Sequence, residues 1–171
     1  PANPLFGLHP APCNVAVKLS QIQPLWPTQV ALNPVDNTLH WIDNNVVLKV
    51  TTSQHVQVAA GQPQHCAAQQ KSKSSSTPLT GSHITSFAFG PSGQLYLVEK
   101  PGVNTTRLVE TGSRGDSPAE SIECVHQSDV QGPCTVPGSI SSLAVSPDGS
   151  IYLADKQMLQ IFSLEYSSPQ P

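Results

Sequence analysis

The chain has 171 residues, a charged share of 11% and a formal net charge of -3, so it lacks the basic field that would hold a phosphate backbone, and nucleic acid is excluded as an expected partner. Its 17 prolines and 11 glycines, beside a hydrophobic share of 37%, favour many short strands joined by turns and polar loops. No apolar run approaches the roughly 18 to 20 residues of a membrane-spanning helix, so direct membrane insertion by this segment is not expected.

The first strand pair is predicted in "TQVALNPVDNTLHWID", where apolar and polar residues alternate on both sides of a turn at Asp36 and Asn37. Two more strands are predicted at Val46–Thr51 and His55–Ala60. Four successive antiparallel strands form one blade of a β-propeller, so residues 26–61 are predicted to form such a blade.

The same pattern returns twice further along the chain, as "ITSFAFGPSGQLYLVE" and "ISSLAVSPDGSIYLAD". Each copy has two alternating strands around a turn that contains glycine, and Asp-Gly in the last copy is a strong hairpin signal. Each copy ends on an acidic residue, and these residues, Asp43, Glu99 and Asp155, lie 56 residues apart (43 to 99, then 99 to 155). The spacing indicates a structural repeat that holds more than one hairpin.

A repeat near this length is typical of propeller blades, with the surplus residues in loops. The predicted fold class is therefore all-β, a β-propeller segment of about three four-stranded blades that is incomplete on its own, because closed propellers have about four to eight blades. A β-sandwich of the same strands is the alternative, and the equal spacing favours the propeller. The expected layout is one partial propeller over 1–171, with a loop from a preceding blade at 1–25, a blade at 26–61, a loop at 62–81, a blade at 82–125, a loop at 126–137 and an incomplete blade at 138–166.

The four cysteines, Cys13, Cys66, Cys124 and Cys134, contain no C-x-x-C pair, so their spacing indicates neither a zinc knuckle nor a redox motif. An even number of cysteines in loop-like sequence favours disulfide bonds and an oxidising compartment. Of the three possible connectivities we favour Cys124 with Cys134, which are close in one loop, and hence Cys13 with Cys66. Unpaired thiols are the alternative.

Two short motifs predict surface sites. "NTT" makes Asn104 an N-glycosylation acceptor after an expected turn. "GSRGDS" contains Arg114, Gly115 and Asp116, the tripeptide that integrins recognise, in which the carboxylate completes a metal site on the receptor. A solvated turn without a partner is the alternative for this tripeptide.

No constellation of residues predicts catalysis. The six histidines are scattered and show no zinc-binding spacing. The strand-end acids Asp43, Glu99 and Asp155 recur at equivalent positions, which favours a structural role as acceptors for backbone N–H groups. We therefore expect no enzyme activity, no catalytic residue, no metal site and no cofactor. The alternative is a propeller enzyme of the lyase or lactonase type with a metal in its central channel.

Two stretches of the chain resemble a known family. The alternation of apolar residues with x-Pro-x-Gly and aromatic-x-x-Asp resembles the NHL repeat of propellers. "PLWPTQVALNPVDNTLHWIDNNVVLKVTTSQHVQVAAGQPQHC" and "SISSLAVSPDGSIYLAD" resemble the NHL region of teneurins, the large cell-surface adhesion proteins of nervous systems. The shared motifs include Trp-Pro-Thr, Asn-Pro-x-Asp-Asn and Ala-Gly-x-Pro-x-His-Cys. The middle of the chain departs from the family, because only Cys124 and Cys134 stand where the family has a cysteine-dense loop.

The resemblance implies an NHL-type β-propeller in the extracellular part of a single-pass plasma-membrane protein. It implies cell adhesion and cell-surface signalling, with a second teneurin or an adhesion receptor as the partner, and no catalysis. An integrin ligand acting through Asp116 and a metal-dependent propeller enzyme are the competing functions.

Overall fold

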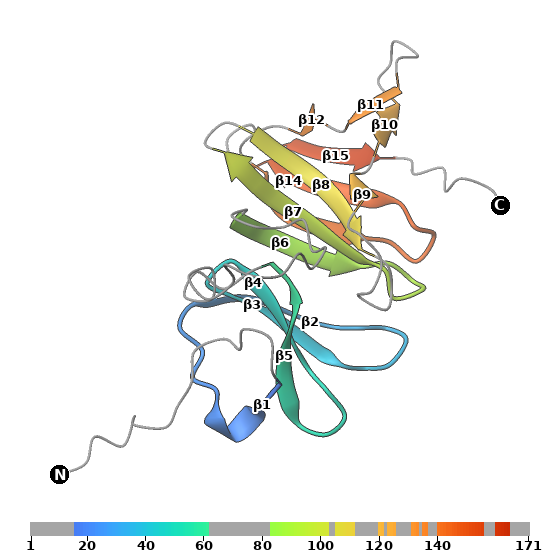
Figure 1. Ribbon diagram of the computed structural model, residues 1–171. Coiled ribbons are helices and arrows are strands. Elements are labelled where there is room, and N and C mark those ends of the chain that lie inside the picture. Colours follow the sequence, from blue (N-terminus) through green and yellow to red (C-terminus); the bar gives the residue numbers. More distant parts are fainter. Residues whose placement is uncertain are drawn as a thin grey trace.

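The computed structural model describes residues 16–61, 83–102, 105–111, 120–121, 123–125, 131–133, 135–136, 140–155 and 160–164. Apart from the single 3-10 turn η1 (Leu19–Gln21), every helix or strand in this described part of the chain is a β-strand. Figure 1 shows three main antiparallel sheets that follow one another in sequence order. The predicted all-β fold is confirmed.

The first sheet has the strand order β1-β5-β4-β3-β2. The segment expected to be only a loop at 1–25 contains β1, which pairs with β5 and adds a fifth strand to the sheet. The bounds are β1 (Val17–Lys18), β2 (Pro27–Leu32), β3 (Leu39–Asp43), β4 (Val46–Val50) and β5 (His55–Ala60).

The second sheet has the order β12-β8-β7-β6, and β9 also pairs with β8. The stretch 126–137 was expected to be a loop, but it contains β11 and β12. The strand β12 pairs with the outer edge of β8. The strands β10 and β11 form a separate small hairpin. The bounds are β6 (His83–Phe89), β7 (Leu95–Gly102), β8 (Thr105–Thr111), β9 (Glu120–Ser121), β10 (Glu123–Val125), β11 (Gln131–Pro133) and β12 (Thr135–Val136).

The third sheet has three strands in the described part of the chain, in the order β13-β14-β15. They are β13 (Ile140–Val145), β14 (Ile151–Asp155) and β15 (Gln160–Leu164). The strand β6 contacts both β2 and β13, so the edge strands of the three sheets lie in succession. This arrangement is that of consecutive propeller blades and differs from the two facing sheets of a sandwich.

The hairpin turns lie where the sequence predicts them. Asn37 has φ 55°, Gly93 has φ 83° and Gly149 has φ 90°, all in the left-handed region that glycine and asparagine tolerate best. Aspartate side chains close two of these turns, because the Asp36 Oδ1 atom accepts a hydrogen bond from the Thr38 N–H at 2.9 Å and the Asp148 Oδ1 atom accepts one from the Ser150 N–H at 3.1 Å. Local turn chemistry therefore fixes the register of each hairpin.

The first strand of each hairpin carries a β-bulge at the same place. The register shifts between Pro27 and Gln29 in β2, between Ile84 and Ser86 in β6, and between Ile140 and Ser142 in β13. The extra residue in each strand is a threonine or serine. Because a bulge bends the strand and increases its twist, its recurrence shows that the three sheets repeat in backbone geometry as well as in residue pattern.

The hydrophobic core lies between the sheets. One cluster joins the first sheet to the second through Ile42, Val47, Ala60, Ile84, Phe87, Leu95, Leu97 and Val109. A second cluster joins the second sheet to the third through Tyr96, Val98, Leu108, Ile140, Leu143, Ile151 and Leu153. Each of these clusters draws side chains from two sheets, so the sheets are held face to face by apolar burial.

His40 lies in the first of these interfaces and should make stability depend on pH. Its ring is 4% exposed, lies edge-on to Phe89 with the ring centroids 4.8 Å apart, and has Nδ1 3.1 Å from the Thr38 carbonyl oxygen. Burial lowers the pKa of His40 below its ordinary value of 6.5, nearby Lys49 lowers it further, and the Thr38 carbonyl and Asp36 oppose the shift.

Because the folded pKa of His40 is lowered, the unfolded chain binds its proton more tightly, and stability should fall as the pH drops from about 7.5 to about 5.5. Urea unfolding at several pH values measures this slope. The variant His40→Gln should have a shallower slope than the parent chain. Equal slopes in the parent and His40→Gln would contradict the assignment.

Candidate functional site

One of the predicted site residues has a described backbone. Cys124 lies in β10 opposite Gly132 of β11. The others lie outside the described residues, and they are Cys13, Cys66, Cys134, Asn104, Arg114, Gly115 and Asp116. The disulfide pairing, the glycosylation site and the integrin tripeptide therefore stay predictions.

The strand-end acid of the first sheet has the structural role that its recurrence predicts. Asp43 is 1% exposed, and its Oδ1 accepts hydrogen bonds from the backbone N–H groups of Leu25 at 3.0 Å and Trp26 at 2.6 Å. Its Oδ2 also lies 3.0 Å from the Leu25 nitrogen. The carboxylate thus ties the segment entering β2 to the end of β3. Glu99, at the equivalent position of β7, is fully buried.

The strand positions of these acids are known from the pairing of their strands. Asp43 pairs with Pro27 and Glu99 pairs with Ile84, each at or near the end of the second strand of its hairpin. No group of three or more His, Cys, Asp or Glu side chains that could hold a metal occurs among the described residues. Asp43 is therefore a backbone acceptor in the described structure.

Polar side chains at the residues that follow the bulges of β2 and β6 join the three sheets. Gln29 reaches from β2 to β6, where its Nε2 donates to the Phe87 carbonyl at 2.6 Å and its Oε1 accepts from the Phe87 N–H at 3.1 Å. At the equivalent place in β6, the Ser86 hydroxyl donates to Gln29 Oε1 at 3.1 Å and accepts from the Leu143 N–H at 3.0 Å. At both interfaces, a side-chain oxygen therefore accepts a backbone N–H of an edge strand, as the backbone of a paired strand would. The sequence pattern did not reveal this link, because it joins residues 57 or 58 positions apart.

Among the described residues, the exposed large apolar side chains lie mainly on or beside the first sheet. They are Leu19, Leu25, Trp26, Val30, Leu32, Val35, Leu39 and Tyr152. Seven of them lie on the first sheet, its hairpin turn or the segment leading into it, and Tyr152 lies on the third sheet. Trp26 is 73% exposed, which is typical of a side chain available for contact with another molecule.

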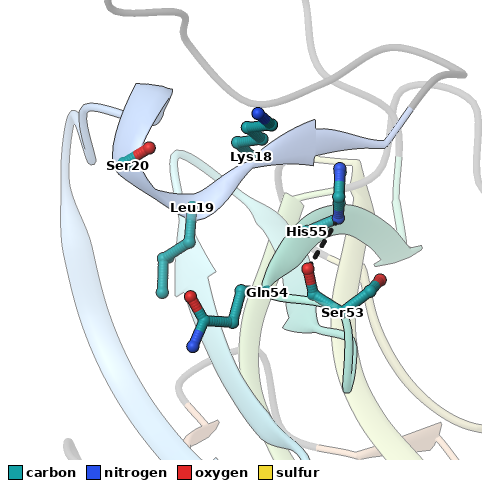
Figure 2. Close-up of a pocket in the computed structure, with 6 residues that line it drawn as sticks. All are labelled: Lys18, Leu19, Ser20, Ser53, Gln54 and His55. Atoms are coloured by element: carbon teal, nitrogen blue, oxygen red, sulfur yellow. Dashed lines mark hydrogen bonds between the residues drawn. The ribbon is translucent and has the colours of Figure 1, made fainter.

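A pocket of about 440 Å³ lies at the outer edge of the first sheet. Figure 2 shows the six residues that line it, with Lys18 and His55 directed to one side and Leu19 and Gln54 to the other. The Leu19 N–H donates to the Gln54 carbonyl at 2.8 Å and joins the two walls. The other two lining residues are Ser20 and Ser53. Its lining holds amine, imidazole, hydroxyl and amide groups but no carboxylate or thiol, so it is equipped to hydrogen-bond acceptor groups.

Comparisons with known proteins identify a family. The family model described as the teneurin NHL domain matches residues 2–165. The chain is 32% identical to mouse teneurin-3 over 184 residues, covering 98% of this chain and 7% of that protein. It is 33% identical to Drosophila melanogaster teneurin-m over 178 residues, covering 94% of this chain and 6% of that protein. The chain thus spans only a small part of the length of these relatives.

A solved structure supports the fold alone. A structural-genomics protein of unknown function from Bacteroides thetaiotaomicron matches 81% of this chain and 34% of its own chain, with a TM-score of 0.57 and 16% sequence identity. At that identity the match shows a shared arrangement of strands and carries no information about ligands or activity.

Removing the Asp43 carboxylate should destabilise the first sheet. In Asp43→Ala the N–H groups of Leu25 and Trp26 lose a charged acceptor, which should cost about 1 to 3 kcal/mol of unfolding free energy. Chemical denaturation measures the loss. Asp36→Ala, which removes an exposed carboxylate from a turn, is the control and should cost less. A loss in Asp43→Ala no larger than in the control would refute the capping role.

Proposed function

We propose, from the premise that this chain belongs to the teneurin NHL domain family, that it is an extracellular recognition module of a teneurin-like plasma-membrane protein and performs no catalysis. The family match over residues 2–165 carries the proposal. The proposed partners are a second teneurin-like molecule or an adhesion receptor on a neighbouring cell.

The described structure is suited to recognition. The apolar interfaces and the Gln29 and Ser86 hydrogen bonds join the sheets in series, so residues at their edges are presented by a packed scaffold. The exposed Trp26, just before β2, and the pocket beside Lys18 offer an apolar and a hydrogen-bonding contact next to the same sheet. These are the two kinds of contact that protein interfaces combine.

The cysteine and glycosylation predictions fit an extracellular location. We propose disulfide bonds between Cys13 and Cys66 and between Cys124 and Cys134, and a glycan on Asn104. Disulfides persist in an oxidising compartment, and N-glycans are attached to exported chains. No helix in the described residues is long and apolar enough to cross a membrane.

The recognition role can be tested with the pocket of Figure 2. Beads coated with the purified chain should bind cells that display teneurins or their adhesion receptors, and uncoated beads should not. The double variant Lys18→Ala with His55→Ala should weaken binding about fivefold or more, as expected when contact residues worth more than about 1 kcal/mol are removed. Lys49→Ala, on β4, is the matched control. Absence of binding by the parent chain would reject the proposed function, and equal binding by all variants would move the contact away from this pocket.

The integrin-ligand function remains a second proposal because the chain contains Arg114, Gly115 and Asp116 in sequence. Surfaces coated with the chain should then support integrin-dependent cell attachment, and Asp116→Glu should abolish it, because the added methylene moves the carboxylate relative to the receptor metal. Asp129→Glu is the control, with the same chemical change elsewhere in the chain. Unchanged attachment to the Asp116→Glu variant would dismiss this function.

A further inference from the structure

The pocket beside Lys18 combines a cationic group with several hydrogen-bond donors. Lys18 contributes an ammonium group and His55 an imidazole, and the remaining polar groups are the Gln54 amide and the hydroxyls of Ser20 and Ser53. Hydrogen bonds from such donors are strongest when the acceptor oxygen carries a negative charge. The lining therefore favours an anionic ligand.

The acids of the same part of the chain are engaged away from the pocket. Residues 16–61, which form the first sheet, contain two acids, Asp36 and Asp43. Asp43 is buried and accepts two backbone N–H groups, and Asp36 accepts the N–H and the hydroxyl of Thr38 in the turn between β2 and β3. Neither acid of this segment lines the pocket, so neither neutralises the charge of Lys18 there.

Lys18 and His55 form a cross-strand pair in the pocket. They are directly opposite each other where β1 pairs with β5, so their side chains share one face of the sheet, with Cβ atoms about 5 Å apart. Figure 2 shows the nitrogen-bearing ends of both side chains directed to the same side. Two cationic groups placed opposite each other repel when both are charged. An anion held between them converts this repulsion into two attractions.

Hydrogen bonds within the first sheet hold the donors in place. The Nδ1 atom of His55 lies 2.8 Å from the Ser53 carbonyl oxygen, and because a carbonyl oxygen can only accept, Nδ1 carries a proton. The Nε2 atom is thus left for a ligand, to which it donates when the ring is protonated. The Leu19 N–H donates to the Gln54 carbonyl at 2.8 Å and holds β1 against the turn before β5. The donors are therefore positioned before a ligand binds, which lowers the entropy cost of binding.

The cross-strand pair lies on the face of the first sheet that is turned toward the second sheet. Side chains alternate along a strand, so His55 shares its face with Gln57, which is opposite Lys49. Lys49 is in turn opposite His40, and His40 contacts Phe89 of the second sheet. The pair is therefore on the same face as an interface that the described chain itself contains.

The charge of the chain and the apolar part of the lining favour a single carboxylate side chain over a polyanion. The formal net charge of the chain is -3, so its long-range field does not attract a polyanion, whereas one carboxylate matches the local charge of the pocket. Leu19 also lines the pocket and is 42% exposed, so it offers apolar surface to the methylene groups of a glutamate. The volume of about 440 Å³ is that of a pocket for a group larger than a simple ion.

We propose that this pocket binds the carboxylate of an acidic side chain, glutamate in particular, on a protein partner. Lys18 supplies the positive charge, protonated His55 donates a hydrogen bond from Nε2, and Leu19 contacts the methylene groups. The hydroxyls of Ser20 and Ser53 supply further donors. The assignment to a protein partner rests on the recognition function proposed above, whereas the affinity for a carboxylate does not.

A titration followed by NMR of the backbone amides of the purified chain tests the pocket without cells. The probe is a blocked peptide, acetyl-Ala-Glu-Ala-amide, and acetyl-Ala-Gln-Ala-amide is the matched neutral control. The amide signals of Leu19, Gln54 and His55 should shift saturably with the glutamate peptide and stay in place with the glutamine peptide. Lys18→Gln should weaken binding about fivefold, the upper end for an exposed ion pair, and Lys18→Arg should retain most of it. Lys49→Gln, on the same face but outside the pocket, should bind as the parent does.

The outcomes separate this proposal from the recognition function. Equal shifts with the two peptides, unchanged binding by a Lys18→Gln variant whose spectrum shows it to be folded, or tighter binding of inorganic sulfate than of the glutamate peptide would overturn the carboxylate site. A chain that binds cells but not the glutamate peptide would reject this site alone. A chain that binds the glutamate peptide but no cells would reject the recognition function and leave the carboxylate site in place.

Discussion

The structure depends on burying both faces of each sheet. A sheet of this repeat has apolar residues on both sides, so it is stable only between neighbours, and the burial of one large side chain such as Phe87 or Leu97 is worth about 1.5 to 3 kcal/mol. The two faces differ, because the face that a sheet turns toward the next sheet has alanine on its edge strand, as at Ala31 and Ala88. The large side chains of the next sheet pack against these alanines.

The parts of the fold that depend on local chemistry could be predicted from the sequence. Alternation places residues such as Leu143 and Leu153 on one face, and turn residues such as Gly93 and Gly149 adopt the positive φ that their hairpins need. The equal spacing of the three hairpins then indicated a propeller, because identical units that repeat along a chain tend to stack on one another. The structural role of Asp43 followed from its recurrence alone.

The parts that depend on distant partners could not be predicted. The amide of Gln29 is polar, and nothing local distinguishes it from a solvent-exposed residue, yet both of its functional groups bind Phe87, 58 positions away. The recurring bulge was hidden for the same reason, because it appears only when two strands are placed in register. The two-residue strands β1 and β12 are too short to show alternation, and they form because β5 and β8 offer them unpaired edges.

The repeat also distinguishes residues that hold the sheets together from residues that do not. Polar residues stand at the same register in successive sheets, and the contact that recurs explains them: Gln29 and Ser86 each accept a backbone N–H of the next sheet. A residue with no counterpart needs another explanation. Trp26, which precedes the bulge of β2, occupies the register position of His83 before the bulge of β6, and its exposed indole supports no packing between sheets. The proposed recognition role accounts for this side chain, since tryptophan is enriched among the residues that dominate binding at protein interfaces.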